Sequence, residues 1–225
     1  MRGGSFMRYA KNVYSQNGED GIIAEIIKRL EIKQPGRCVE FGTGNGRDLS
    51  NTLTLIEKGW SGVWIEQNEE SFYKAKALGD TFGGRVEVLH GTVGFTRCSA
   101  YDDTLDNFLG KPFPREFDVL SIDIDSFDLQ VWAATTEHRA SIVVIEINSS
   151  IPVGVKQVHA NGGPQGASFS SMLELGIEKG YQLVCHTGNL IFVDAKYRDK
   201  LGMEAFEIDH PASLFNDMWA KWAGR

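Results

Sequence analysis

Short apolar runs alternate with segments of helical pattern along most of the chain. The apolar runs occupy residues 37–42, 62–67, 85–93, 117–125 and 141–148. The segments whose apolar residues recur at helical spacing cover about residues 17–30, 50–58, 71–82, 104–110 and 129–138. Nearly continuous apolar strands that alternate with helices are typical of a parallel sheet covered by helices on both faces. The pattern therefore predicts an α/β fold.

The C-terminal part of the chain follows a different pattern. A helical segment at residues 168–180 precedes two strand-like runs, residues 181–187 and 190–195, which are joined by Gly188-Asn189. This pair of residues is typical of a tight hairpin, and no helix fits between the two runs. We therefore expect the sheet to finish with an antiparallel pair, whereas a dinucleotide-binding dehydrogenase would continue with parallel crossovers.

Length and composition restrict the classes of function. The 225 residues suffice for one α/β domain, which we assign to residues 7–225, and the opening residues 1–6 read as a leader added for expression. The net charge of −7 and the lack of a Lys/Arg block argue against nucleic acid or an anionic membrane as partners. No apolar run reaches the length of a membrane span. Apolar residues at helical spacing in residues 212–224 predict a helix that packs on the domain or forms a homodimer surface.

The three cysteines bear on the cellular compartment. Cys38, Cys98 and Cys185 are far apart in the sequence and odd in number, and none belongs to a CxxC pair. Isolated cysteines of this kind indicate reduced thiols, and we therefore expect a soluble, cytoplasmic protein.

A glycine-rich loop follows the first predicted strand. Gly42, Gly44 and Gly46 stand at alternate positions there, ahead of a helical segment, and Glu66 closes the next strand. Glycines permit a sharp turn and let a ligand approach backbone N–H groups, and a carboxylate at the end of the second strand can accept hydrogen bonds from a ribose. The dinucleotide fingerprint GxGxxG would require glycine where Arg47 stands. The combination favours a cofactor that contains a ribose.

At this point the chain resembles the class I S-adenosylmethionine-dependent methyltransferases, and within them the FkbM-like family. The motifs that carry the resemblance are "VEFGTGNG", "TLDNFL", "LSIDIDSFDLQVW" and "VVIEIN", within residues 12–195. The resemblance implies a three-layer Rossmann-like fold with a mostly parallel, seven-stranded sheet that ends in a C-terminal antiparallel hairpin. The family pattern after the fourth strand reads Lys-Ile-Asp-Val-Glu-Gly, whereas residues 121–126 here read "SIDIDS". The acceptor preference of the family is therefore not carried over as a whole.

The resemblance also implies contacts to the cofactor. Glu40, Gly42 and Gly44 would lie along the methionine and ribose parts of S-adenosylmethionine. Glu66 would hold the ribose hydroxyls.

Further contacts are implied at the two ends of the cofactor. Gln67 would approach the adenine, and Gly91 and Thr92 would flank its ring. Asp123, which ends the fourth strand, would face the amino or sulfonium group. Gln16, just ahead of the first helix, would either fold over the cofactor or help to cap that helix.

Acidic residues gather where the fourth and fifth strands end. Asp123 and Asp125 point the same way on an extended chain, as do Glu146 and Asn148, and ligands of open α/β sheets bind at this edge. A hydroxyl acceptor needs a base or a metal ion to give up its proton. Two mechanisms remain open: Asp125, Glu146 or His159 acts as the general base, or Asp125, Glu146 and Asn148 bind Mg²⁺.

A long loop without regular pattern covers residues 149–168. Loops of this length are commonly functional, and this one is predicted at the carboxyl edge of the sheet, so we expect a substrate lid. His159 in this loop is a candidate base or substrate contact, although a solvated surface position fits a single loop histidine equally well.

These observations lead to one prediction and two alternatives. We expect an S-adenosylmethionine-dependent methyltransferase that methylates a hydroxyl on a sugar, a nucleotide sugar or a small natural product, with Mg²⁺ as an optional metal. The acceptor class follows from the resemblance alone. The alternatives are an NAD(P)-dependent oxidoreductase or epimerase with a variant glycine loop, and a nucleoside-binding module without catalysis.

Overall fold

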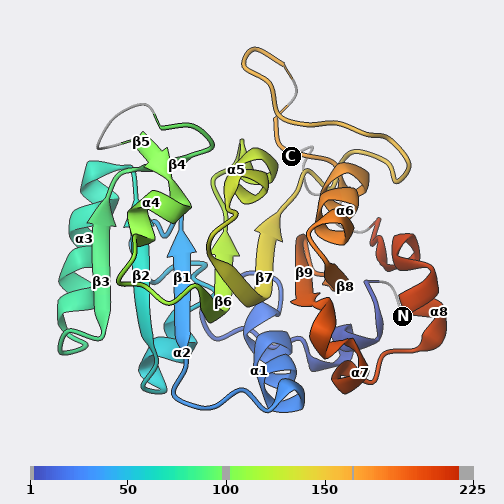
Figure 1. Cartoon of the computed structure of the whole chain (residues 1–225), viewed down its shortest axis with the longest axis horizontal. Coiled ribbons are helices and arrows are strands. Elements are labelled where there is room, and N and C mark those ends of the chain that lie inside the picture. Colours follow the sequence, from blue (N-terminus) through green and yellow to red (C-terminus); the bar gives the residue numbers. More distant parts are fainter. Residues whose placement is uncertain (1–2, 98–101, 164, 218–225) are drawn as a thin grey trace.

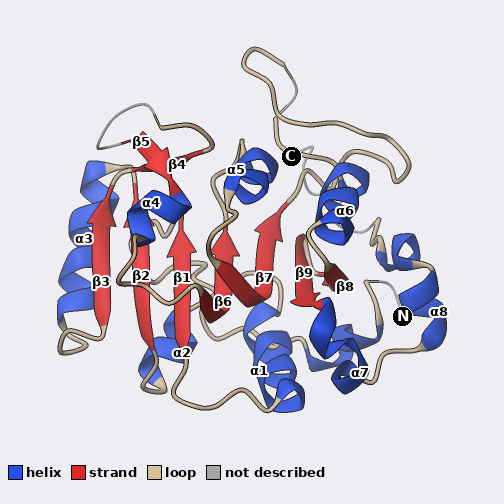
Figure 2. Cartoon of the chain, viewed as in Figure 1, coloured by secondary structure: helices blue, strands red, loops and turns tan. Residues whose placement is uncertain are grey.

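The computed structural model describes residues 3–97, 102–163 and 165–217, and its centre is a seven-stranded sheet (Figures 1 and 2). The strand order is β3-β2-β1-β6-β7-β9-β8. The strands of this sheet are β1 (Arg37–Phe41), β2 (Ser61–Glu66), β3 (Val86–His90), β6 (Glu116–Ile122), β7 (Arg139–Glu146), β8 (Tyr181–His186) and β9 (Asn189–Asp194). A separate parallel pair consists of β4 (Thr92–Gly94) and β5 (Asp102–Thr104).

The pairing confirms both predicted features of the sheet. Strands β3, β2, β1, β6 and β7 pair in parallel, and β9 then pairs antiparallel with β7 on one side and with β8 on the other. The hairpin at Gly188 turns β8 back so that β9 fits between β7 and β8, and Gly188 has a φ of 108°, which suits glycine. The fold is therefore the predicted three-layer, Rossmann-like α/β fold with a C-terminal antiparallel pair.

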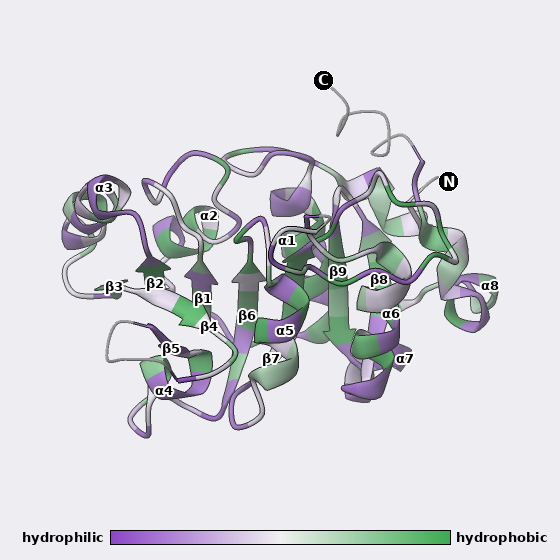
Figure 3. Ribbon diagram, turned by 90° about the horizontal axis from the view of Figure 1, so that it is seen from above, coloured by the Kyte–Doolittle hydropathy of each residue, from purple (hydrophilic) through white to green (hydrophobic). Residues whose placement is uncertain are grey.

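Helices cover both faces of the sheet. The α-helices are α1 (Glu19–Leu30), α2 (Leu53–Glu57), α3 (Glu69–Asp80), α4 (Leu105–Leu109), α5 (Asp128–Ala134), α6 (Phe169–Glu178), α7 (Arg198–Leu201) and α8 (Ala205–Asp209), and the 3-10 helices are η1 (Ser5–Tyr9), η2 (Ala195–Tyr197) and η3 (Pro211–Leu214). Seen from above, α1 and α2 lie on one side of the sheet and α4, α5 and α6 on the other (Figure 3). None of the helices in the described part of the chain is long and apolar enough to cross a membrane.

Alternating strand residues feed two separate cores. On β1, Val39 and Phe41 pack into the core under α4, α5 and α6, whereas Cys38 packs into the core under α1 and α2. Trp132 of α5 fills the first core and contacts the ring of Phe192 at a centroid distance of 5.1 Å. Both faces of the parallel strands are buried in this way, which explains why these strands read as nearly continuous apolar runs.

Several predicted elements differ from the structure, and the strand expected at residues 117–125 ends at Ile122. The helix expected at residues 129–138 ends at Ala134, because the carboxylate of Asp106 accepts backbone N–H groups from residues 136–138 at 2.7–3.0 Å. The strand expected at residues 85–93 ends at His90, and the chain then turns away to form β4. The C-terminal helix is not formed as far as residue 217, since only η3 is present there, and the rest of that segment lies outside the described residues.

The N-terminal residues and the cysteines bear on two further predictions. Phe6 is fully buried, and Ser5 donates two hydrogen bonds to the Glu207 carboxylate, so these residues pack on the domain. Their assignment to an added leader stays a prediction.

Cys38 and Cys185 are buried free thiols whose pKa values are raised by burial, and Cys98 lies outside the described residues.

Candidate functional site

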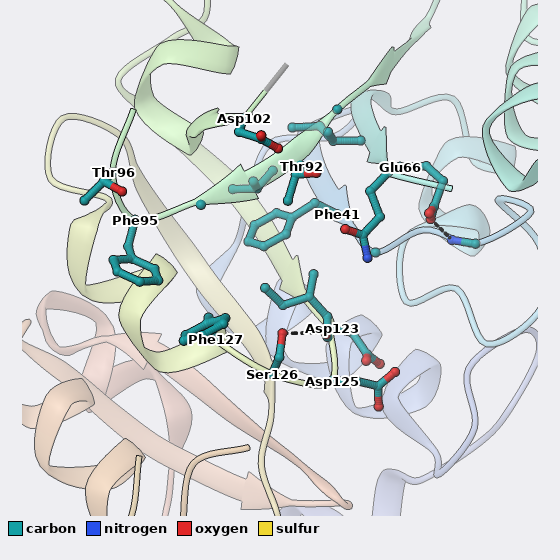
Figure 4. A pocket seen from close by; sticks show the side chains of 18 of the residues that line it. Phe41, Glu66, Thr92, Phe95, Thr96, Asp102, Asp123, Asp125, Ser126 and Phe127 are labelled. Carbon is teal, nitrogen blue, oxygen red and sulfur yellow. Dashed lines mark hydrogen bonds between the residues drawn. The ribbon is translucent and has the colours of Figure 1, made fainter. Parts of the chain in front are cut away.

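A cavity of about 590 Å³ opens at the carboxyl ends of β1, β2 and β6 (Figure 4). This volume falls within the usual range for small-molecule sites. The predicted cofactor residues on its wall are Gly42, Gly44, Glu66, Gln67, Gly91, Thr92 and Asp123. The edge of the sheet where open α/β folds bind ligands therefore brings together seven of the nine predicted contacts.

The three glycines of the loop differ in what an added Cβ atom would meet. A Cβ atom on Gly42 would lie 1.6 Å from the Asp123 carbonyl oxygen, so glycine is needed where β1 and β6 approach each other. A Cβ atom on Gly46 would lie 2.9 Å from the Trp64 ring. At Gly44, by contrast, a Cβ atom would have no neighbour within 4 Å, and the residue lines the cavity. The bare backbone at Gly44 is therefore open to a ligand.

Glu66 is held in place by backbone donors. The N–H of Gly44 donates to Oε2 at 2.7 Å, and the N–H of Asn68 donates to Oε1 at 2.8 Å. The side chain is buried within the wall of the cavity. Each oxygen retains a lone pair, so this fixed carboxylate can accept the two hydroxyl hydrogens of a ribose.

Glu40 lies behind the glycine loop and does not line the cavity. Its carboxylate accepts hydrogen bonds from the Ser50 hydroxyl at 2.7 Å, the Asn51 N–H at 2.8 Å and the Thr52 hydroxyl at 2.6 Å. Burial raises the pKa of this carboxyl group above its ordinary value. The structure thus gives Glu40 a bracing role for the loop that leads into α2, and its contact with a cofactor stays a prediction.

One end of the cavity, where the rings of Phe95 and Phe127 lie, is apolar and includes residues that the sequence did not single out. The rings of Phe95 and Phe127 lie 5.2 Å apart, and both line the cavity together with Phe41 and Ile65 (Figure 4). This end suits a flat base such as adenine. No sequence signal identifies Phe95, because its position depends on the turn that takes β4 away from the sheet.

Three carboxylates meet where β6 and β7 end. One carboxylate oxygen from each of Asp123, Asp125 and Glu146 lies within 4.8 Å of the others. Asp125 has a φ of 58°, a left-handed conformation that aspartate tolerates better than most residues, and its N–H donates to Glu146 Oε2 at 3.1 Å. The predicted gathering of acids at this edge is therefore present.

The local environment favours the protonated forms of two of these acids. Burial, followed by repulsion from Asp128 and Asp125, raises the pKa of Asp123 to about 7. Burial, followed by repulsion from Asp123, raises the pKa of Glu146 to about 9. No ion pair joins the three acids to a Lys, Arg or His among the described residues. The cluster is therefore suited to a positively charged guest.

A second cavity of about 350 Å³ lies on the other side of this cluster. Asp123 and Asp125 line both cavities, and Gln16, Glu146 and Asn148 line only the second. Gln16 is therefore placed beside this second space and not on the wall of the first. The acids thus form a shared wall between a cavity suited to a nucleoside and a smaller polar cavity.

Asn148 is turned toward the lid loop. Its side-chain oxygen accepts hydrogen bonds from the N–H of Ser150 at 3.0 Å and from the Ser150 hydroxyl, and its side-chain nitrogen donates to the Gln165 carbonyl at 2.9 Å. The oxygen that would bind a metal ion is therefore used by the loop. Asp123, Asp125 and Glu146 form the acid cluster, and binding of a metal ion by Asn148 stays a prediction.

His159 does not reach the acid cluster. Its Nδ1 accepts the N–H of Gly166 at 3.1 Å, and its ring packs edge-on against Phe127 at a centroid distance of 4.3 Å. His159 lines neither cavity. This geometry does not support a role as the base. The residue instead links the loop at residues 149–168 to Phe127.

The loop at residues 149–168 borders both cavities. Asn161 lines the first cavity, Gln165 lines the second, and the Gln165 side chain donates to the Asp125 carbonyl at 2.7 Å. In Figure 1 this loop runs above the ends of β6 and β7. Its role as a substrate lid stays a prediction.

Comparisons with known proteins found only distant similarity to solved structures. No family model and no curated protein matches the chain. Among solved structures, the N-terminal domain of EvdMO1 with S-adenosylhomocysteine bound is 14% identical over 80% of each chain, with a TM-score of 0.48. The glycopeptide N-methyltransferase MtfA is 10% identical over 83% of this chain and 94% of its own, with a TM-score of 0.47. M. capricolum TrmK with S-adenosylhomocysteine is 13% identical over 82% and 73%, with a TM-score of 0.46. Similarity at this level does not assign an activity to the chain.

Proposed function

We propose that the protein is an S-adenosylmethionine-dependent methyltransferase that acts on a small molecule. The observation that carries the proposal is the pairing of Gly44 and Glu66: a bare backbone edge and a fixed carboxylate face the same cavity, 2.7 Å apart through their hydrogen bond. A second, polar cavity adjoins the first at Asp123. Two neighbouring cavities of this kind suit a nucleoside cofactor and a separate acceptor.

The cofactor would occupy the first cavity from end to end. The adenine would lie between the apolar residues near Phe95 and Phe127, with Gln67 and Thr92 beside it, and the ribose would bind Glu66. The positively charged sulfonium and amino groups would then point toward Asp123. This orientation places the methyl group at the border with the second cavity, where an acceptor can reach it.

Methyl transfer requires an aligned acceptor that can lose a proton. In the proposed step a hydroxyl oxygen attacks the methyl carbon, the carbon–sulfur bond breaks, and S-adenosylhomocysteine leaves uncharged. The hydroxyl proton passes to a carboxylate of the cluster, for which Glu146 and Asp125 are the candidates. The sulfonium charge beside the cluster favours the ionised form of Glu146 and so prepares it to accept the proton.

A divalent cation such as Mg²⁺ also fits the cluster. Asp123, Asp125 and Glu146 would hold it, since carboxylate oxygens are its preferred ligands, whereas the Asn148 oxygen is engaged by Ser150. When bound, the ion would lower the pKa of an acceptor hydroxyl. Comparing activity in EDTA with activity in added Mg²⁺ separates this mechanism from catalysis by a carboxylate alone.

Several finer predictions are kept as parts of this proposal. Three of them rest on the sequence. They are the acceptor, a hydroxyl on a sugar, a nucleotide sugar or a small natural product; membership of the FkbM-like family; and the cytoplasmic location. The amide and acid side chains that line the second cavity support a polar acceptor.

Calorimetric titration tests the proposed cofactor. We expect S-adenosylhomocysteine to bind with a micromolar constant, about −8 kcal/mol, and NAD⁺ and NADP⁺ not to bind. Gly44→Val should abolish the binding and Glu66→Ala should weaken it, whereas the control Glu87→Ala, at an exposed position on β3, should leave it unchanged. Saturable binding of a nicotinamide cofactor in the absence of S-adenosylhomocysteine binding would refute the proposal.

A further inference from the structure

The wall of the second cavity has a one-sided charge. Its residues come from the loop before α1, from the ends of β6 and β7, from the lid loop and from the hairpin between β8 and β9. They include the carboxylates of Asp123, Asp125 and Glu146 and the amides of Gln16 and Gln165, but no Lys, Arg or His among the described residues. An anionic group that entered this cavity would oppose the ionisation of these acids and would find no cationic partner.

Two basic residues of loops at this edge of the sheet are engaged elsewhere. Lys156 of the lid forms an ion pair with Glu174 at 2.6 Å, and the guanidinium of Arg47 lies over the ring of Tyr14 at 5.3 Å. Neither Lys156 nor Arg47 lines the cavity. The acids of the wall therefore have no cationic counterpart within the described chain.

The Asp123 carboxylate is open to a guest. Within the described ranges, no N–H or hydroxyl group of the protein donates a hydrogen bond to it, whereas the neighbouring Asp128 carboxylate accepts two, from Ile124 and Ser126. Figure 4 shows the Asp123 and Asp125 side chains pointing to the same side of their loop. A donor bound at this point would complete the hydrogen bonds that the protein leaves unmade.

From the charge of the second cavity we infer that the acceptor is a cationic polyol of the amino-sugar class. Sugars that would place a phosphate, diphosphate or carboxylate group beside Asp123 and Asp125 are excluded. The inference rests on the proposed function and narrows it: of the predicted acceptors, nucleotide sugars are set aside. The ammonium group pairs with Asp123 and Asp125, and the amides of Gln16 and Gln165 bind hydroxyl groups.

Three pyranoses of equal shape and different charge test this inference. D-glucosamine, D-glucose and D-glucuronate are titrated into the protein saturated with S-adenosylhomocysteine, in EDTA and near neutral pH, with ligand-observed NMR as the readout. We expect D-glucosamine to bind at least tenfold more tightly than D-glucose, and D-glucuronate to bind more weakly than both. The preference should fall to less than threefold in Asp125→Asn, and it should persist in Asp80→Asn, an exposed control on α3.

The possible outcomes distinguish failure of this inference from failure of the proposed function. Binding of S-adenosylhomocysteine without a preference for D-glucosamine overturns this inference and leaves the proposed function standing. Tighter binding of D-glucuronate than of D-glucosamine overturns it as well. When the titration is repeated with Mg²⁺ in place of EDTA, binding of D-glucose only under that condition also overturns it, in favour of a metal site. Failure of S-adenosylhomocysteine to bind overturns the proposed function and this inference with it.

Discussion

The raised pKa of Glu146 makes the stability of the protein depend on pH. Burial and the neighbouring Asp123 raise this pKa from 4.5 to about 9, so the folded protein without ligands keeps a proton on Glu146 that the unfolded chain releases above about pH 4.5. The carboxyl group therefore favours unfolding increasingly as the pH rises. Glu146→Gln keeps the shape of the protonated acid and removes the titration, so this variant should be the more stable protein at neutral pH.

The size of the effect follows from proton linkage. Between the unfolded and the folded pKa, the folded state binds one proton more than the unfolded state at this residue, and the free energy of unfolding falls by about 1.4 kcal/mol per pH unit. From about pH 5.5 to about pH 7.5, the gap between Glu146→Gln and the parent should therefore widen by up to about 2.7 kcal/mol. For a domain of this length that corresponds to roughly 5–11 °C in Tm.

Thermal unfolding of the two proteins at several pH values measures this gap. The melting temperature of Glu146→Gln should lie above that of the parent at about pH 7.5 and should approach it toward about pH 4.5. Added S-adenosylmethionine should narrow the gap, because its positive charge favours the ionised carboxylate. A gap that does not change with pH, or a variant that is less stable than the parent at neutral pH, would refute the assigned environment of Glu146.

Four further substitutions test the rest of the site. Gly42→Ala should destabilise the protein by more than about 4 kcal/mol in denaturant unfolding, since its Cβ atom would meet the Asp123 carbonyl, whereas Gly44→Ala should cost only about 1–2 kcal/mol and mainly weaken binding of S-adenosylhomocysteine. Glu66→Gln should weaken that binding by about 10- to 100-fold in calorimetry, because charge-assisted hydrogen bonds to the ribose are lost. His159→Ala should leave methyl transfer within about twofold of the parent, as its ring lies outside both cavities. A loss of activity above about tenfold would restore His159 as a candidate base.

The features that could be predicted from the sequence are those set by local pattern. The parallel strands appear as apolar runs because both of their faces are buried, and the hairpin at Gly188 was visible because a tight turn needs a residue that tolerates a positive φ. The position of Gly44 and Glu66 at one cavity follows from the rule that ligands bind at the carboxyl edge of such a sheet.

The features that the sequence could not supply depend on contacts between distant segments. Glu40 was expected at the cofactor, but the residues around position 50 fold back and take up its carboxylate. Asn148 lines the second cavity with the acids, as expected, but Ser150 engages the oxygen that was predicted to bind Mg²⁺. In both cases the hydrogen-bond donors come from loop residues whose positions the sequence pattern does not reveal. Likewise the helix that begins at Asp128 stops early because Asp106, far away in sequence, accepts the N–H groups that would have continued it.

The acid cluster illustrates how the site relates to the stability of the fold. Asp125 adopts a left-handed backbone conformation, and Glu146 is buried next to other acids, so each lowers the stability of the protein without a ligand. The electrostatic cost falls when a positive charge enters, because a cation stabilises the ionised carboxylates. The sulfonium of the proposed cofactor would approach from the first cavity, and the inferred ammonium group of the acceptor would approach from the second. The cluster would therefore reach its most stable state with both molecules bound, which is the arrangement from which methyl transfer proceeds.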